Sequence, residues 1–133
     1  MPLQELRLNN NRLSGLLPDY WARLTNLHTL DLSNNNLSGE IPITWVSMQN
    51  VATIDLSNNR FTGRIPEEWE FMSGPNYKLR CLSVYGNSYL DSLSQTEKKF
   101  KDAGNRVRLV AKPEDTVFCE DPNSPAVAPT GQR

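Results

Sequence analysis

Residues 27–50 read LHTLDLSNNNLSGEIPITWVSMQN, and residues 51–74 read VATIDLSNNRFTGRIPEEWEFMSG. Residues 3–26, LQELRLNNNRLSGLLPDYWARLTN, align with both without a gap, so a unit of 24 residues occurs three times in succession. A partial fourth copy, residues 79–93, follows a short insertion and lacks the Gly and Pro of the earlier copies. Recurrence at a fixed period of about 20–50 residues predicts a solenoid, in which each unit packs on its neighbours. The recurring columns include Asn11, Asn35 and Asn59; Gly15, Gly39 and Gly63; Pro18, Pro42 and Pro66; and Trp21, Trp45 and Trp69.

The pattern L-x-x-L-x-L-x-x-N-x-L is identified as that of the leucine-rich repeats, whose period is about 20–29 residues. This resemblance implies an α/β-type repeat solenoid: a short leucine-rich-repeat coil stack with a parallel concave sheet. The extension L-S-G-x-I-P resembles the plant-type subclass. The element P-x-x-W followed by S-M, as in residues 42–48, is similar to the promastigote surface antigen family of kinetoplastid parasites.

The alternation L-x-L near the start of each copy predicts a short strand that buries one face against the next coil. The Asn that follows each strand has two amide donors and one acceptor, enough to satisfy turn backbone in its own coil and in its neighbour. We therefore expect a structural ladder, and we expect Ala to cost far more at Asn59 than at Asn58. The tryptophan column allows two interpretations, packing on the convex side of the core or an exposed aromatic row. We favour packing. The predicted ladder consists of Asn11, Asn35, Asn59 and Asn87.

The side chains between the inward leucines are expected to face the concave surface, where solenoids commonly bind partners. They form a small, polar and weakly acidic ribbon with one aromatic residue at its C-terminal end. The alternative is an ordinary solvated surface. The candidate binding residues are Arg7, Thr29, Asp31, Ser33, Thr53, Asp55, Ser57, Ser83 and Tyr85.

The two ends of the chain differ. Nothing before Leu3 covers the first coil, so we expect the C-terminal fragment of a longer protein. Residues 94–121 predict a C-terminal cap: Ser94 and Glu97 match a capping box, the helix stops at Gly104, and residues 106–112 alternate like an edge strand. We therefore divide the chain into leucine-rich repeats (residues 1–93, with copies at 3–26, 27–50, 51–78 and 79–93), a cap (94–121) and a disordered Pro-rich tail (122–133).

Two cysteines, Cys81 and Cys119, allow one disulfide. The bond would join the last coil to the cap and needs an oxidising compartment, which the resemblance to extracellular proteins implies. Two free thiols in an intracellular protein remain the alternative. The triplet Asn36-Leu37-Ser38 is an N-glycosylation pattern that falls inside the repeat and matters only in a secreted chain.

Composition excludes several classes of function. The 133 residues carry a formal charge of −1, which argues against a nucleic-acid partner, and no apolar run is long enough to span a membrane. A single histidine, His28, and the lack of any metal-ligand or phosphate-binding motif argue against an enzyme, a metal site or a cofactor. We expect a non-enzymatic module of a surface or secreted protein that recognises a protein or glycan ligand. The compartment is inferred from the resemblance, because no signal peptide is visible. The alternatives are a structural spacer or stalk without a specific ligand, and an intracellular scaffold.

Overall fold

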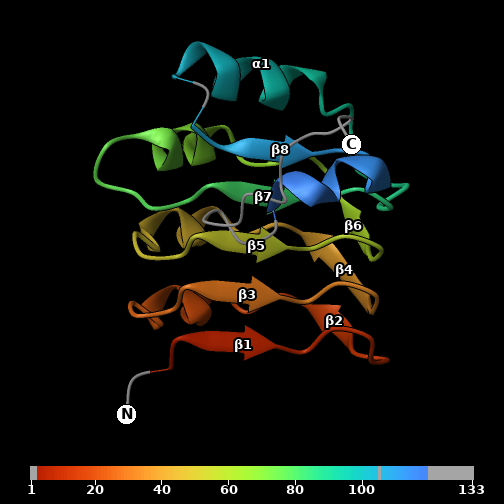
Figure 1. Cartoon of the computed structure of the whole chain (residues 1–133). Coiled ribbons are helices and arrows are strands. Elements are labelled where there is room, and N and C mark those ends of the chain that lie inside the picture. The colour runs from red at the N-terminus through yellow and green to blue at the C-terminus, as the bar shows by residue number, and fades with distance from the viewer. Residues whose placement is uncertain (1–2, 105, 120–133) are drawn as a thin grey trace.

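The structure is a computed structural model that describes residues 3–104 and 106–119, with side chains described as far as Thr116 in the second segment. The predicted disordered tail, residues 122–133, lies outside the described residues. In Figure 1 the chain rises coil by coil from β1 to β8, with α1 across the far end.

The main sheet has five parallel strands, paired in the order β1-β3-β5-β7-β8. Its register places the inward residues Leu6, Leu30, Ile54, Leu82 and Leu109 in one row across the sheet. The three central members of this row are 0% exposed, so coil stacking produces the core that a single coil lacks. The strands are β1 (Glu5–Arg7), β3 (Thr29–Asp31), β5 (Thr53–Asp55), β7 (Cys81–Ser83) and β8 (Arg108–Val110).

A second, three-stranded parallel sheet follows the asparagine turn of the first three coils, in the order β2-β4-β6. Sequence analysis did not predict it, because the L-S-G-x-I segment lacks a clear alternation. A proline then precedes a short 3-10 helix on the back of each coil. These elements are β2 (Ser14–Leu16), β4 (Asn36–Glu40), β6 (Arg60–Thr62), η1 (Asp19–Arg23), η2 (Ile43–Ser47) and η3 (Glu67–Ser73).

The asparagine ladder satisfies turn backbone between coils. The Asn59 amide nitrogen lies 2.9 Å from the Leu32 oxygen of the preceding coil and 3.1 Å from the Ser57 oxygen of its own coil. Its oxygen accepts a 3.0 Å hydrogen bond from the N–H of Leu37. Asn87 repeats the arrangement one coil further on, accepting from the N–H of Phe61 at 3.1 Å.

The residue before each of the first three ladder asparagines has left-handed backbone. Asn10, Asn34 and Asn58 have φ angles of 60°, 59° and 56°. Asn tolerates this region better than other residues with a side chain. The expectation that Ala costs far more at Asn59 than at Asn58 rested on exposure and did not include this backbone strain.

The tryptophan column is packed on the back of the coils rather than displayed. Trp45 and Trp69 are 0% exposed, and Trp21 in the first coil is half-buried. Adjacent rings stack, with centroids 6.1 Å and 6.5 Å apart. The indole N–H groups of Trp45 and Trp69 donate to the carbonyls of Pro18 and Pro42, so each tryptophan also ties its coil to the preceding one.

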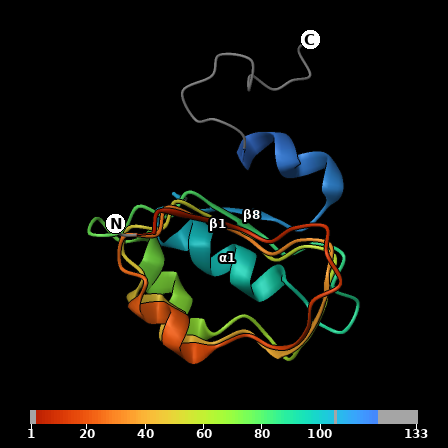
Figure 2. The ribbon, with the colours of Figure 1, turned by 90° about the horizontal axis from the view of Figure 1, so that it is seen from below.

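The C-terminal end of the stack is covered by α1 (Ser94–Asp102), which packs against η3 and β8 (Figure 2). Its Phe100 is 2% exposed, and the turn after it uses Gly104 at φ 111°, as predicted. The capping-box prediction was wrong. Ser94 lies inside the first turn, and the hydroxyl of Ser92 instead accepts the Ser94 N–H at 3.3 Å.

These elements confirm a repeat solenoid with a parallel sheet and a helix and strand near the C-terminus. The division of the chain into repeats and cap stays a prediction. A last 3-10 helix, η4 (Pro113–Cys119), follows β8 and contacts β7 and β8.

Candidate functional site

The solvent-facing side of the main sheet, called the concave face below, presents two rows of side chains in register. Thr29 lies beside Thr53, and Asp31 beside Asp55, on the paired strands β3 and β5. Arg7 adjoins Asp31 at the β1 end, and Ser83 adjoins Asp55 at the β7 end. These rows follow from the two-residue period of the strands, which sequence analysis read directly.

Each aspartate of the row is held by the serine two residues later. Asp31 Oδ1 accepts the Ser33 N–H at 3.1 Å and the Ser33 hydroxyl at 2.7 Å. Asp55 Oδ1 accepts the same two bonds from Ser57, at 3.1 Å and 2.6 Å. Both serines are buried. Ser33 and Ser57 therefore fix the orientation of the carboxylates rather than offer their own hydroxyls to a ligand.

The two carboxylates form no ion pair with a residue that the structure describes. Within the described residues, no Lys or Arg nitrogen forms an ion pair with Asp31 or Asp55; the neighbouring Arg7 instead pairs with Glu5 at 3.1 Å. Burial raises the pKa of Asp55 above its ordinary value, and the adjacent Asp31 charge raises it further. The hydrogen bonds from Ser57 and the nearby Ser83 hydroxyl lower the pKa without cancelling these effects.

The C-terminal segment turns part of the concave face into a pocket. In Figure 2, η4 lies outside the outline of the coils, on the side of the main sheet. Its Thr116 closes a pocket of about 240 Å³ over the sheet, which also includes Cys81. Six of the predicted binding residues line this pocket: Arg7, Thr29, Asp31, Thr53, Asp55 and Ser83.

The other three predicted residues do not line the pocket: Ser33 and Ser57 are buried and bonded to the aspartates, and Tyr85 is half-buried. The sequence did not identify Thr116, because the contact predicted for the segment after β8 was the Cys81–Cys119 disulfide alone. One signal was available: Pro113 followed by Glu114 and Asp115 is a favourable helix start.

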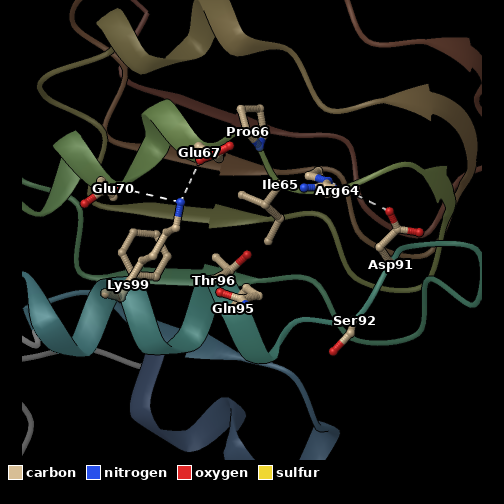
Figure 3. Close-up of a pocket in the computed structure, with 11 residues that line it drawn as sticks. Arg64, Ile65, Pro66, Glu67, Glu70, Asp91, Ser92, Gln95, Thr96 and Lys99 are labelled. Carbon is tan, nitrogen blue, oxygen red and sulfur yellow. Dashed lines mark hydrogen bonds and ion pairs between the residues drawn. The ribbon is translucent and has the colours of Figure 1, made fainter.

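A second pocket, of about 420 Å³, lies between η3 and α1 (Figure 3). It forms where the partial fourth coil lacks the Gly-Pro segment, and Ile65 and Phe100 supply its apolar part. Its Lys99 points toward η3, where Nζ lies 2.8 Å from Glu67 and 3.9 Å from Glu70. The bond from Lys99 lowers the pKa of Glu67. Lys99, Glu67 and Glu70 of this second pocket are thus paired within the protein, whereas Asp31 and Asp55 form no ion pair with a described residue.

The disulfide stays a prediction. Cys81 is 2% exposed on β7, but the side chain of Cys119 lies outside the described residues. Among the described residues, no three His, Cys, Asp or Glu side chains are grouped to hold a metal ion. No helix in the described part of the chain has the length and apolar character needed to cross a membrane.

Comparisons with known proteins agree with this architecture. Residues 2–61 match the family model described as leucine rich repeat. No curated protein sequence matches the chain significantly.

The chain is similar to solved leucine-rich-repeat ectodomains of Arabidopsis receptor kinases. One structure contains the receptor kinase HAESA with the peptide hormone IDA and the co-receptor SERK1 (30% identity, 64% of this chain, 13% of that chain, TM-score 0.58). A second is the BIR3–SERK2 complex (37% identity, 67% of this chain, 45% of that chain, TM-score 0.60). A third is the ectodomain of SOBIR1 (37% identity, 66% of this chain, 45% of that chain, TM-score 0.56). The chain thus spans less than half the length of each of these three chains. The described coils form a leucine-rich-repeat solenoid similar to plant receptor-kinase ectodomains.

Proposed function

We propose that this chain is a non-enzymatic recognition module that binds a protein or peptide ligand across its concave face. The observation that carries the proposal is that the carboxylates of Asp31 and Asp55 lie side by side in a pocket on the sheet, are oriented by serine bonds, and form no ion pair with a described residue. Recognition sites often hold such unfavourable charge arrangements, because the ligand supplies the missing partner.

The similar proteins support a protein ligand. HAESA was solved with a peptide hormone and a co-receptor, and another similar chain comes from the complex of BIR3 with SERK2. A glycan ligand, which the polar ribbon also suggested, is tested beside it. We also infer a surface or secreted location, because the similar proteins are receptor ectodomains. A Cys81–Cys119 disulfide would fit that location by tying η4 to the concave face.

The narrower similarity to promastigote surface antigens rests on the P-x-x-W element. The tryptophans of that element stack between coils, so they stabilise the solenoid and give no information about a ligand. A surface-antigen role is therefore a subordinate part of this proposal.

The proposal is tested by selecting binders to residues 1–133 from a phage-displayed library of random peptides and by probing a printed glycan array. Selected binders are then measured against Thr53→Arg, which places a bulky cation in the pocket. Thr62→Arg is the matched control, because Thr62 is an exposed strand threonine on β6, away from the concave face.

We expect peptide binders whose affinity falls at least ten-fold with Thr53→Arg and is unchanged with Thr62→Arg. Binders equally sensitive or insensitive to both changes would show that the concave face is not the site. Binding to glycans on the array without any selected peptide would show that the ligand is a glycan and not a peptide. Failure of both libraries would favour the spacer or stalk.

A further inference from the structure

The concave face places two aspartates side by side, an unfavourable arrangement that the packing of the coils does not require. Asp31 and Asp55 are direct neighbours on parallel strands, and like charges at such positions repel. Each carboxylate uses Oδ1 to accept two bonds from its own serine. Among the described residues, the well-formed hydrogen bonds to both carboxylates all go to Oδ1, and the Ser83 hydroxyl is the further group that lowers the pKa of Asp55. The Oδ2 atoms therefore have capacity for additional donors in a partly desolvated pocket.

The same pocket also contains a buried hydroxyl. Ser83 continues the row beyond Asp55 and is only 3% exposed. Its Oγ lies close enough to Asp55 to lower the pKa of that carboxyl, but it makes no hydrogen bond of good geometry with any described residue. Buried hydroxyls are normally paired, so this one keeps hydrogen-bonding capacity that a ligand in the pocket can use.

From these observations we infer that Asp31, Asp55 and Ser83 form a subsite for the cationic end of a lysine or arginine side chain of a peptide ligand. This inference rests on the proposed function, since it names the chemistry of the ligand at the same face. A side-chain cation donates several N–H groups, and all three pocket groups can accept them. Charge-assisted bonds of this kind are shorter and stronger than neutral ones.

A metal ion fits the pocket less well. Calcium takes about six to eight oxygen ligands, whereas this pocket offers two carboxylates whose Oδ1 atoms already accept serine bonds. The pocket volume of about 240 Å³ is below the usual range for a whole small-molecule ligand and suits the end of one side chain. The η4 segment contributes Thr116 to the pocket, so the Asp55 end is more enclosed than an open sheet surface.

The test uses the full chain and three defined probes: acetyl-arginine amide, acetyl-lysine amide and acetyl-citrulline amide. Citrulline matches arginine in shape but is uncharged. Backbone chemical shifts are followed by NMR during titration of the wild type, Asp55→Asn and Asp31→Asn. Glu68→Gln is the control variant, because Glu68 is an exposed carboxylate on η3, remote from the concave face.

We expect the arginine or lysine probe to shift resonances on β3, β5 and β7, with citrulline at least ten-fold weaker. Asp55→Asn should weaken binding at least ten-fold and Glu68→Gln should leave it unchanged. Equal binding of citrulline, or no effect of either aspartate substitution, would overturn the subsite. Calcium chloride that shifted the same resonances at lower concentration would overturn it in favour of a metal site.

The two proposals fail in different ways. Selected peptides that need the concave face but carry no basic residue, and that bind Asp55→Asn normally, would contradict the cation subsite while supporting the recognition module. Selected peptides enriched in Lys or Arg that lose affinity for Asp55→Asn would support both.

Discussion

Removing one rung of the asparagine ladder gives the sharpest test of how the solenoid is held together. In Asn59→Ala the N–H of Leu37 loses its 3.0 Å acceptor inside the core. A buried donor left without a partner costs about 1–3 kcal/mol. Three carbonyls also lose the amide of Asn59, but each has another donor. Leu32 keeps that of Asn35, and Leu56 that of Asn87.

The amide carries two hydrogens, so it supplies the equivalent of two bonds, each contributing about 0.5–1 kcal/mol net. The total predicted loss in the free energy of unfolding is therefore about 2–5 kcal/mol. Asn11→Ala is the matched comparison. Asn11 is exposed, its amide donates to the carbonyls of Leu8 and Asn9, and its oxygen accepts nothing from a described residue. We expect a loss below about 1 kcal/mol there, since the affected groups stay in contact with water.

Urea unfolding followed by both tryptophan fluorescence and circular dichroism measures the two losses. The two signals must coincide before a two-state free energy is derived. Equal midpoints for Asn59→Ala and Asn11→Ala, at unchanged slope, would refute the idea that the ladder acts through buried bonds between coils.

Four further changes have defined outcomes. Trp69→Phe should lower stability by about 1–2 kcal/mol, measured by urea unfolding, because the indole N–H bond to the preceding coil is lost while the ring stays apolar. Asn58→Ala should cost about 1 kcal/mol in the same assay and Asn58→Gly much less, since φ is 56°. Asp55→Asn should raise the unfolding midpoint at pH 7 relative to wild type, with the gain disappearing in acid. Burial raises the pKa of this carboxyl in the folded state, so the folded form binds the proton more tightly and loses relative stability as the pH rises through that window. Finally, if Cys81 and Cys119 are bonded, reduction should destabilise the protein by up to roughly 4 kcal/mol in the loop-entropy model, with intact mass showing the gain of two hydrogens.

Each of these outcomes has a contrary result. Trp21→Phe is the control for the tryptophan, because Trp21 is half-buried and begins the stack. An equal loss of stability in Trp21→Phe would argue against a special role of the buried tryptophans. Equal losses of stability in Asn58→Ala and Asn58→Gly would show that backbone strain at this position is not the cause. A lower midpoint for Asp55→Asn at pH 7 would show that the charged bonds to Ser57 outweigh burial and repulsion. Alkylation of both cysteines in the native, unreduced protein would show that no disulfide forms.

Much of the fold could be read from the repeat. The two-residue alternation placed Leu30 and Ile54 inward and Asp31 and Asp55 outward, and the register of β3 and β5 agrees. The repeat placed Trp45 and Trp69 at the same position of successive coils, and the expected packing is confirmed because both are 0% exposed. Both inferences succeed since coil stacking converts a position in the repeat into a fixed direction in space.

Local patterns outside the repeat were less informative. The match of Ser94 and Glu97 to a capping box placed the helix start correctly, but the hydroxyl that accepts a first-turn N–H belongs to Ser92. Capping depends on backbone angles at one residue, and neighbouring serines offer equivalent side chains. The left-handed backbone at Asn58 was missed for a similar reason, since exposure in a sequence pattern says nothing about φ.

The sequence by itself determined the solenoid, the asparagine and tryptophan ladders and the composition of the concave rows. Only the tertiary structure decided which of those side chains form a site. It placed Thr116 of η4 at the pocket over the sheet, buried Ser83 beside Asp55, and buried Ser33 and Ser57, which bond to the aspartates. The physical reason is that a repeat pattern specifies contacts between equivalent positions of adjacent coils. The path of a non-repeating segment depends on contacts between positions that are not equivalent. The same holds for the groups that surround a charged side chain, so the repeat pattern predicts neither.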